Sequence, residues 1–221
     1  MDKAAIYRAA RERILALVRQ GPTDVEVPTT PGWTVKDLVA HLAAFLTVYR
    51  AQGREGFGPG WGDREVAARR DMSLEEAIAE WDEGLSDLGD LFDSPLGTVA
   101  VADVLAHEQD IRTAIDRPGA SDDPGIPPSV EMALAFLTNK PDVADLPSIR
   151  VVTEDVDRTI GDGPPVATLR TTTFELFRVL HGRRTVEQVR DMDWDGDPGG
   201  WAESLFIFGP TERVVEEAAA S

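Results

Sequence analysis

The chain has 221 residues, of which 40 are acidic and 22 are basic, so its formal net charge at pH 7 is −18. Such an acidic surface repels phosphate backbones and anionic lipids, which argues against nucleic-acid and membrane partners. The sequence contains no cysteine, and this excludes disulfides, zinc–thiolate sites and a thiol nucleophile borne by the protein.

The first half of the chain is predicted to form four helices. The first twenty residues carry charges at helical intervals and have no long apolar run, so we expect a helix there rather than a signal peptide, and a cytoplasmic protein. Thr34 with Asp37 and Ser73 with Glu76 have the spacing of helix-capping pairs. The predicted helices cover residues 2–20, 34–49, 73–92 and 98–117, the last one capped by Thr98. Four such helices joined by two long loops predict an antiparallel bundle.

A Gly-rich segment, residues 53–71, separates the second and third predicted helices. Its glycine and proline content predicts irregular structure. A loop of this length is often functional, so we expect it to cover an opening, anchored by Phe57 and Trp61.

The second half is predicted to be a small α+β domain. The acidic, Pro-rich stretch 120–128 is interpreted as a linker between a first domain, 1–119, and a second, 129–221. The elements expected after it are helices at 129–139, 173–181 and 186–192, strands at 149–153, 156–160 and 166–171, turns at 194–197, and an apolar tail at 201–208 that docks back onto a domain.

The predicted fourth helix carries the strongest candidate site. On a helix, Asp103, His107 and Asp110 fall on one strip, separated by about 40° and about 60° around the axis. His41 lies on the apolar stripe of the second helix. Two inward histidines and a carboxylate leave a coordination position for water or substrate, which is typical of catalytic zinc. The pattern alone leaves other readings open, namely core histidines or an Asp–His ion pair, and for Asp110 an orienting, proton-transfer or salt-bridge role.

A second candidate group follows the helix that ends near His181. A histidine or arginine at this position complements the negative end of the helix dipole, which explains the group without any function. The functional alternative is that Arg183 or Arg184 holds the carboxylate of a substrate, for which a planar guanidinium is well suited.

Three stretches together resemble the mycothiol-dependent maleylpyruvate isomerase family, a branch of the DinB-like metal-binding four-helix bundles. They are GWTVKDLVAHL, VLAHEQDIRTAIDRPG and VLHGRRTVEQVRDMDWDGD. The resemblance implies a bundle followed by a domain similar to sterol carrier proteins, with His41, Asp103 and His107 as ligands of a divalent metal and Asp110 as the acid that follows them. Asp103 stands where the isomerase has glutamate, and AHEQDIR differs from the isomerase, so the substrate need not be maleylpyruvate.

The resemblance predicts an enzyme that uses a metal and a low-molecular-weight thiol. Zinc is the expected metal, with nickel as the alternative, and mycothiol is the implied thiol. The reaction would be isomerisation or transfer on a small electrophilic acid, with Asp110 as proton handler and Arg183 as carboxylate clamp. Two alternatives remain at this point: a metal-dependent hydrolase that activates water, and a non-catalytic module that binds a small ligand or acts in a stress response.

Overall fold

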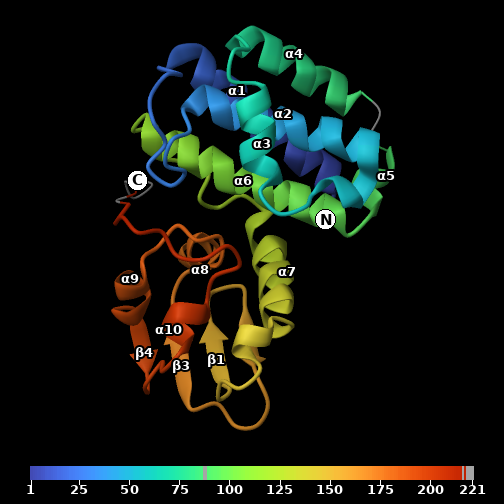
Figure 1. Ribbon diagram of the computed structural model, residues 1–221. Coiled ribbons are helices and arrows are strands. Elements are labelled where there is room, and N and C mark those ends of the chain that lie inside the picture. The colour runs from blue at the N-terminus through green and yellow to red at the C-terminus, as the bar shows by residue number, and fades with distance from the viewer. Residues whose placement is uncertain (87–88, 216, 218–221) are drawn as a thin grey trace. The chain divides into compact units, whose positions relative to one another are not determined.

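The computed structural model describes residues 1–86, 89–215 and 217 (Figure 1). The chain divides into two compact units, Met1–Gly119 and Ala120–Glu216. Helix α7 (Ile126–Thr138) begins inside the stretch interpreted as a linker, with prolines in its first turn. That interpretation, and the domain bounds that go with it, stay predictions. Among the described residues, no helix combines the length and the apolar content needed to cross a bilayer.

The N-terminal unit is helical, and its long helices pack in pairs. Its elements are α1 (Lys3–Gln20), α2 (Val35–Gln52), η1 (Gly53–Gly56), α3 (Trp61–Ala68), α4 (Leu74–Leu85), α5 (Gly89–Asp93) and α6 (Leu96–Ala114). Helix α2 packs against α4, and α1 packs against α6. Their buried faces are mostly apolar, although α6 also buries His107, Glu108, Gln109 and Asp110. Burial of the apolar side chains supplies most of the stabilisation.

The caps predicted for the second and third helices are confirmed, and the structure shows that the first helix is capped too. Asp2 accepts a hydrogen bond from the backbone N–H of Ala5 at the start of α1. Thr34 and Asp37 form a complete capping box at the start of α2, as do Ser73 and Glu76 at α4. Each box satisfies two backbone donors that a helix start leaves unpaired, which explains why these starts are readable from sequence.

Three predictions in this unit were wrong. The Gly-rich segment is not irregular throughout, because η1 and α3 form within it. Helix α4 ends at Leu85 instead of Phe92, and its apolar period continues only because α5 buries Leu91 and Phe92 as a longer helix would. Thr98 is no cap, since α6 begins at Leu96 directly after Pro95, and proline suits a helix start because its missing N–H has no partner to lose there.

The C-terminal unit is a small sheet with helices. Besides α7 it contains η2 (Pro141–Val143), β1 (Ile149–Val152), β2 (Asp157–Ile160), β3 (Ala167–Arg170), α8 (Thr173–Leu180), α9 (Val186–Arg190), β4 (Asp193–Asp195) and α10 (Trp201–Ser204). The strand order is β2-β1-β3-β4, with β1 and β3 parallel and the outer pairs antiparallel. The three predicted strands and the α+β class are confirmed.

Two features of the C-terminal unit bear on the predicted tail and turns. Strand β4 was read as turns, because its three residues are too few for a strand pattern; Trp194 pairs with Leu169 of β3. The tail prediction is confirmed: Trp201 is fully buried and its indole N–H donates to the carbonyl of Pro147 at 2.7 Å.

Candidate metal centre

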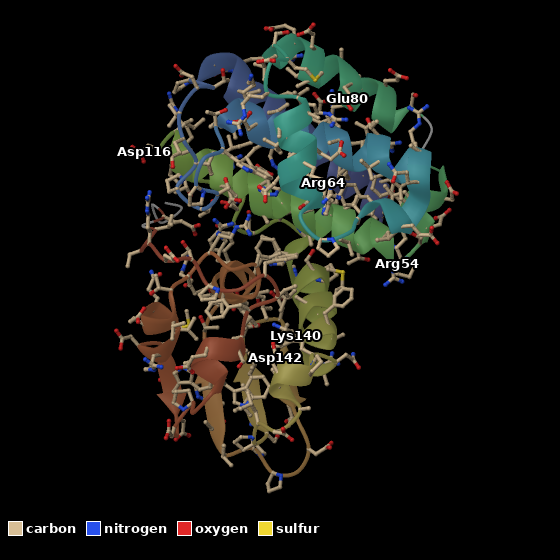
Figure 2. The ribbon with its side chains drawn as sticks, viewed as in Figure 1. Arg54, Arg64, Glu80, Asp116, Lys140 and Asp142 are labelled. Carbon is tan, nitrogen blue, oxygen red and sulfur yellow. The ribbon has the colours of Figure 1, made fainter. Side chains whose placement is uncertain are left out.

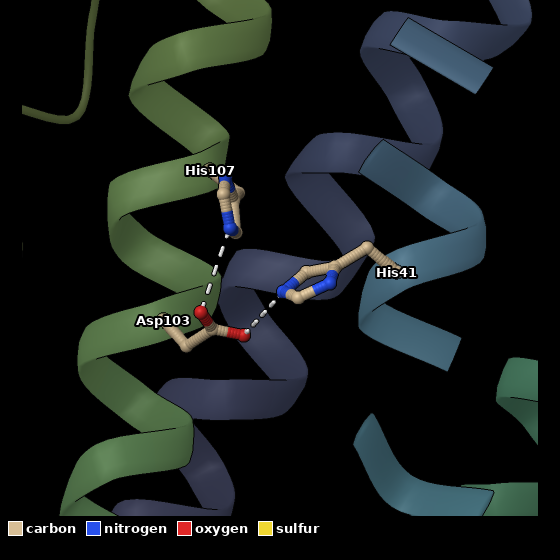
Figure 3. A group of neighbouring side chains, drawn as sticks. All are labelled: His41, Asp103 and His107. Carbon is tan, nitrogen blue, oxygen red and sulfur yellow. Dashed lines mark ion pairs between the residues drawn. The ribbon is translucent and has the colours of Figure 1, made fainter. Parts of the chain in front are cut away.

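Helices α2 and α6 bring three side chains together (Figure 3). His41 comes from α2, and Asp103 and His107 lie one turn apart on α6. The Nε2 atom of His41 lies 3.6 Å from Oδ2 of Asp103, and Nε2 of His107 lies 3.5 Å from Oδ1 of the same carboxylate. One ligand atom from each residue falls within 4.8 Å of the other two.

This spacing fits a divalent ion. Zinc bonds of about 2.1 Å in a tetrahedral arrangement place neighbouring ligand atoms roughly 3.4 Å apart. The two N···O distances, 3.6 Å to Oδ2 and 3.5 Å to Oδ1 of Asp103, are close to this value. Both histidines are buried, whereas the side chain of Asp103 is 24% exposed. Imidazole nitrogens and a carboxylate oxygen are the ligands of catalytic zinc, and the exposed side of Asp103 leaves a way in for a further ligand.

The neighbouring side chains shift the pKa values of Asp103 and His107 in opposite directions. Burial by itself raises the pKa of Asp103, but the two histidines outweigh burial and hold the pKa of this carboxyl well below its usual range. Burial by itself lowers the pKa of His107, but Asp103 and then Asp110 outweigh burial and raise it above its ordinary value. The carboxylate is therefore ionised at neutral pH, the state in which it binds metal.

Asp110 lies one turn further along α6 and contacts the other side of the His107 ring. Its Oδ2 lies 3.0 Å from Nδ1 of His107, and Asp110 is fully buried. In the neutral imidazole, an Nδ1–H that donates to this carboxylate leaves Nε2 without a proton and available as a ligand. The geometry thus suits the orienting role among the three roles left open for Asp110.

Aromatic rings surround His41. The imidazole centroid lies 4.8 Å from the Trp61 ring, 5.1 Å from the Trp33 ring and 4.9 Å from the His107 ring. Phe57 and Trp61 pack on each other and on Phe45, so their predicted role as anchors is confirmed. Sequence reasoning missed that the segment anchored by them forms a helix beside His41, because a contact with α2 leaves no mark on local periodicity.

Arg183 belongs to the C-terminal unit. Its Nη1 donates to the carbonyl of His181, and Arg184 makes two hydrogen bonds with Glu175, at 2.5 and 2.7 Å. The His181 ring nitrogen Nδ1 bonds to the carbonyl of Phe177 at 2.8 Å. All three side chains are buried. The contacts of His181 and Arg183 lie at the end of α8, as the capping interpretation expects, whereas Arg184 pairs with Glu175 in the first turn of that helix. The carboxylate-clamp role of Arg183 stays a prediction.

Comparison with known proteins relates most of the N-terminal unit to a known family. Residues 7–95 match the family model of the mycothiol maleylpyruvate isomerase N-terminal domain. The resemblance to this isomerase family is confirmed. The match includes His41 and stops before α6 begins, so it does not reach Asp103 or His107.

Two solved structures have the isomerase fold in common with this chain. One is the crystal structure of the mycothiol-dependent maleylpyruvate isomerase, 14% identical, which covers 82% of this chain and 88% of its own with a TM-score of 0.51. The other is a histidine-to-alanine mutant of that enzyme, 12% identical, covering 81% and 88% with a TM-score of 0.51. No curated protein matches the chain by sequence. At these identities the likeness to the isomerase is one of fold, and the reaction has to be argued from the site.

Proposed function

We propose that the chain is a divalent-metal enzyme of the cytoplasm that uses a low-molecular-weight thiol, of the mycothiol type, for isomerisation or transfer on a small electrophilic acid. The observation that supports it is the approach of three ligand atoms from His41, Asp103 and His107 to within 4.8 Å of one another. Mycothiol is proposed as the thiol because the solved isomerase of similar fold is mycothiol-dependent. The absence of cysteine agrees with a thiol that comes from outside.

Each residue of the proposed site has its own role. His41, Asp103 and His107 hold the ion, zinc first and nickel second by ligand type. A divalent ion bound there supplies a Lewis acid that lowers the pKa of a thiol. Asp110 holds the His107 ring in the orientation and tautomer that expose Nε2, and we assign it this role ahead of proton handling because it is fully buried. Arg183 is the proposed clamp for a substrate carboxylate.

Metal content tests the first half of the proposal. The purified protein is loaded with zinc, dialysed and measured by elemental analysis beside His41→Ala and His107→Ala. We expect about one ion per chain in the parent and none in either variant. The chain has three histidines, so His181→Ala in the C-terminal unit is the matched control and keeps the ion. A parent protein without zinc, or both variants with it, contradicts the metal site.

Thiol dependence tests the second half. The zinc-loaded protein is assayed on electrophilic acids, maleylpyruvate among them, with and without mycothiol. Turnover that requires the thiol supports the proposal. Turnover without thiol indicates a hydrolase that activates water, and a metal-loaded protein without turnover on any of these acids favours the binding module. Arg183→Lys, which keeps the charge and loses the planar fork, is expected to raise KM more than it lowers kcat.

A further inference from the structure

The first turn of α3 lies directly against His41, and three consecutive residues take part. The ring of Trp61 lies 4.8 Å from the imidazole with an angle of 31° between the planes. At Gly62 a Cβ atom would lie 3.4 Å from Cε1 and 3.5 Å from Nδ1 of His41. Asp63 accepts a hydrogen bond of 3.2 Å from the indole N–H of Trp33, whose ring lies 5.1 Å from the imidazole.

Helix α3 is held at both of its ends. At its start, Trp61 packs on Phe45 of α2, with ring centroids 5.9 Å apart. At its end, Arg69 makes two hydrogen bonds of 2.8 and 2.7 Å with Glu80 of α4, which is labelled in Figure 2. The pKa of the Arg69 guanidinium is raised by this pairing. A helix fixed at both ends presents a rigid surface to His41.

An imidazole ring turns about χ2 over a broad range of angles unless its neighbours restrict it. To act as a ligand, His41 must keep Nε2 at the carboxylate of Asp103, where the distance is 3.6 Å. The edge of the ring formed by Cε1 and Nδ1 faces Gly62, where a Cβ atom would lie 3.4 and 3.5 Å from these two atoms. The ring of Trp61, 4.8 Å from the imidazole, therefore restricts the rotation that would move Nε2 away from Asp103.

We propose that residues 61–63 of α3 are positioning residues for the His41 ligand: Trp61 packs on its ring, Gly62 leaves just enough space beside the Cε1–Nδ1 edge for the ring to keep this orientation, and Asp63 holds Trp33 in place beside it. This inference rests on the proposed metal site and adds to it the chain segment that sets the ligand's orientation. Groups that orient a metal-binding histidine typically contribute about 10-fold to 100-fold to metal affinity.

The space at Gly62 provides a steric test. A methyl group fits, because its nearest neighbours, in His41 and Trp33, would lie at 3.4 Å or more, an ordinary van der Waals distance. Gly62→Ala should therefore keep the affinity for zinc within about threefold and is the matched control. Gly62→Val adds two further carbons in the same space, which must turn the His41 ring, so we expect its zinc affinity to fall by about tenfold or more.

A second pair of variants keeps the inference testable if Gly62→Val does not fold. Asp63→Ala removes the acceptor for the Trp33 indole, whereas Asp63→Asn keeps a carbonyl oxygen at the same place. Asp63→Ala should weaken zinc binding several-fold, and Asp63→Asn should restore most of it.

All variants are compared by competition for zinc with a chromophoric chelator, by the melting temperature of the metal-free protein and by the visible absorption spectrum with cobalt(II). Weaker zinc binding and an altered cobalt spectrum, at a melting temperature close to that of the parent, support the positioning role. Parental zinc affinity and an unchanged spectrum in Gly62→Val and Asp63→Ala overturn it, while the metal site itself stands. A parent protein that binds no zinc refutes the metal site, and the positioning role falls with it.

Discussion

Two clusters of ionisable side chains are centred on acidic residues of helix α6. One is the histidine–aspartate cluster of His41, Asp103 and His107. The other is the glutamate–arginine cluster, in which Glu108 of α6 meets Arg13 of α1 and Arg112. Both include charged atoms that are costly to bury without partners, yet only one of them has the spacing of a metal site.

The two clusters differ in the distances between the carboxylate oxygens and the nitrogens that face them. Glu108 is fully buried, and its two oxygens accept four N–H groups from Arg13 and Arg112 at 2.7 to 3.0 Å. Its hydrogen-bonding capacity is satisfied within the protein. The oxygens of Asp103 lie at 3.5 and 3.6 Å from the two imidazoles, beyond the usual range of a hydrogen bond. A closed ion pair links helices, whereas ligand atoms held slightly apart leave space for an ion between them.

The largest change in stability is expected from breaking the glutamate–arginine cluster. Glu108→Gln removes the countercharge of two arginines in a buried place, and we expect unfolding to become easier by about 3 kcal/mol, which lowers the melting temperature by several degrees. Zinc binding should stay as in the parent. Thermal unfolding measures the first and chelator competition the second, with the exposed Glu75→Gln as control. An unchanged melting temperature would contradict the structural role of this cluster.

The histidine–aspartate cluster is expected to show the reverse, a large loss of zinc affinity with a small change in melting temperature. Asp103→Asn replaces a carboxylate ligand with a neutral amide, so zinc affinity should fall at least about 100-fold, equivalent to about 2.7 kcal/mol. The melting temperature of the metal-free protein should change much less than in Glu108→Gln. Asp116→Asn, an exposed acid just beyond the same helix, is the control. Retained zinc affinity in Asp103→Asn would remove Asp103 from the ligand set.

A smaller loss of zinc affinity is expected from a change at Asp110, one turn beyond His107 on α6. Asp110→Asn keeps the shape of the side chain and loses the charge that faces Nδ1 of His107. We expect zinc affinity to fall about tenfold, since the His107 ring loses part of its orientation and basicity. Calorimetric titration of the metal-free protein with zinc measures the change. A variant that binds zinc as the parent does would leave Asp110 with no role in metal binding.

The smallest loss of stability is expected from a variant that keeps the positive charge in the glutamate–arginine cluster but changes its hydrogen-bonding geometry. Arg112→Lys keeps a positive charge but cannot make both hydrogen bonds to Glu108, so a loss of about 1 kcal/mol is expected. Urea denaturation measures it, with Arg117→Lys as the control outside the cluster. A loss as large as that of Glu108→Gln would mean that the planar fork, rather than the charge, stabilises the pair of helices.

Local patterns predicted much of the helical unit. The capping boxes at Thr34 and Ser73 and the apolar periods of α1 and α2 depend on residues three or four apart, and these were read correctly. The end of α4 at Leu85 and the start of α6 at Leu96 were missed. A break between α4 and α5 does not disturb the apolar period when both pieces bury the same side of the unit.

The sequence by itself determined that Asp103, His107 and Asp110 share one strip of a helix, because spacings of four and three residues are a local property of helical geometry. It also determined, through the absence of cysteine, that any thiol chemistry needs an external thiol. The tertiary structure alone decided that α2 brings Nε2 of His41 to Asp103, that the Gly-rich segment forms a helix against the ring of His41, and that β4 pairs with β3. These features depend on packing between segments far apart in the chain, which no local pattern records.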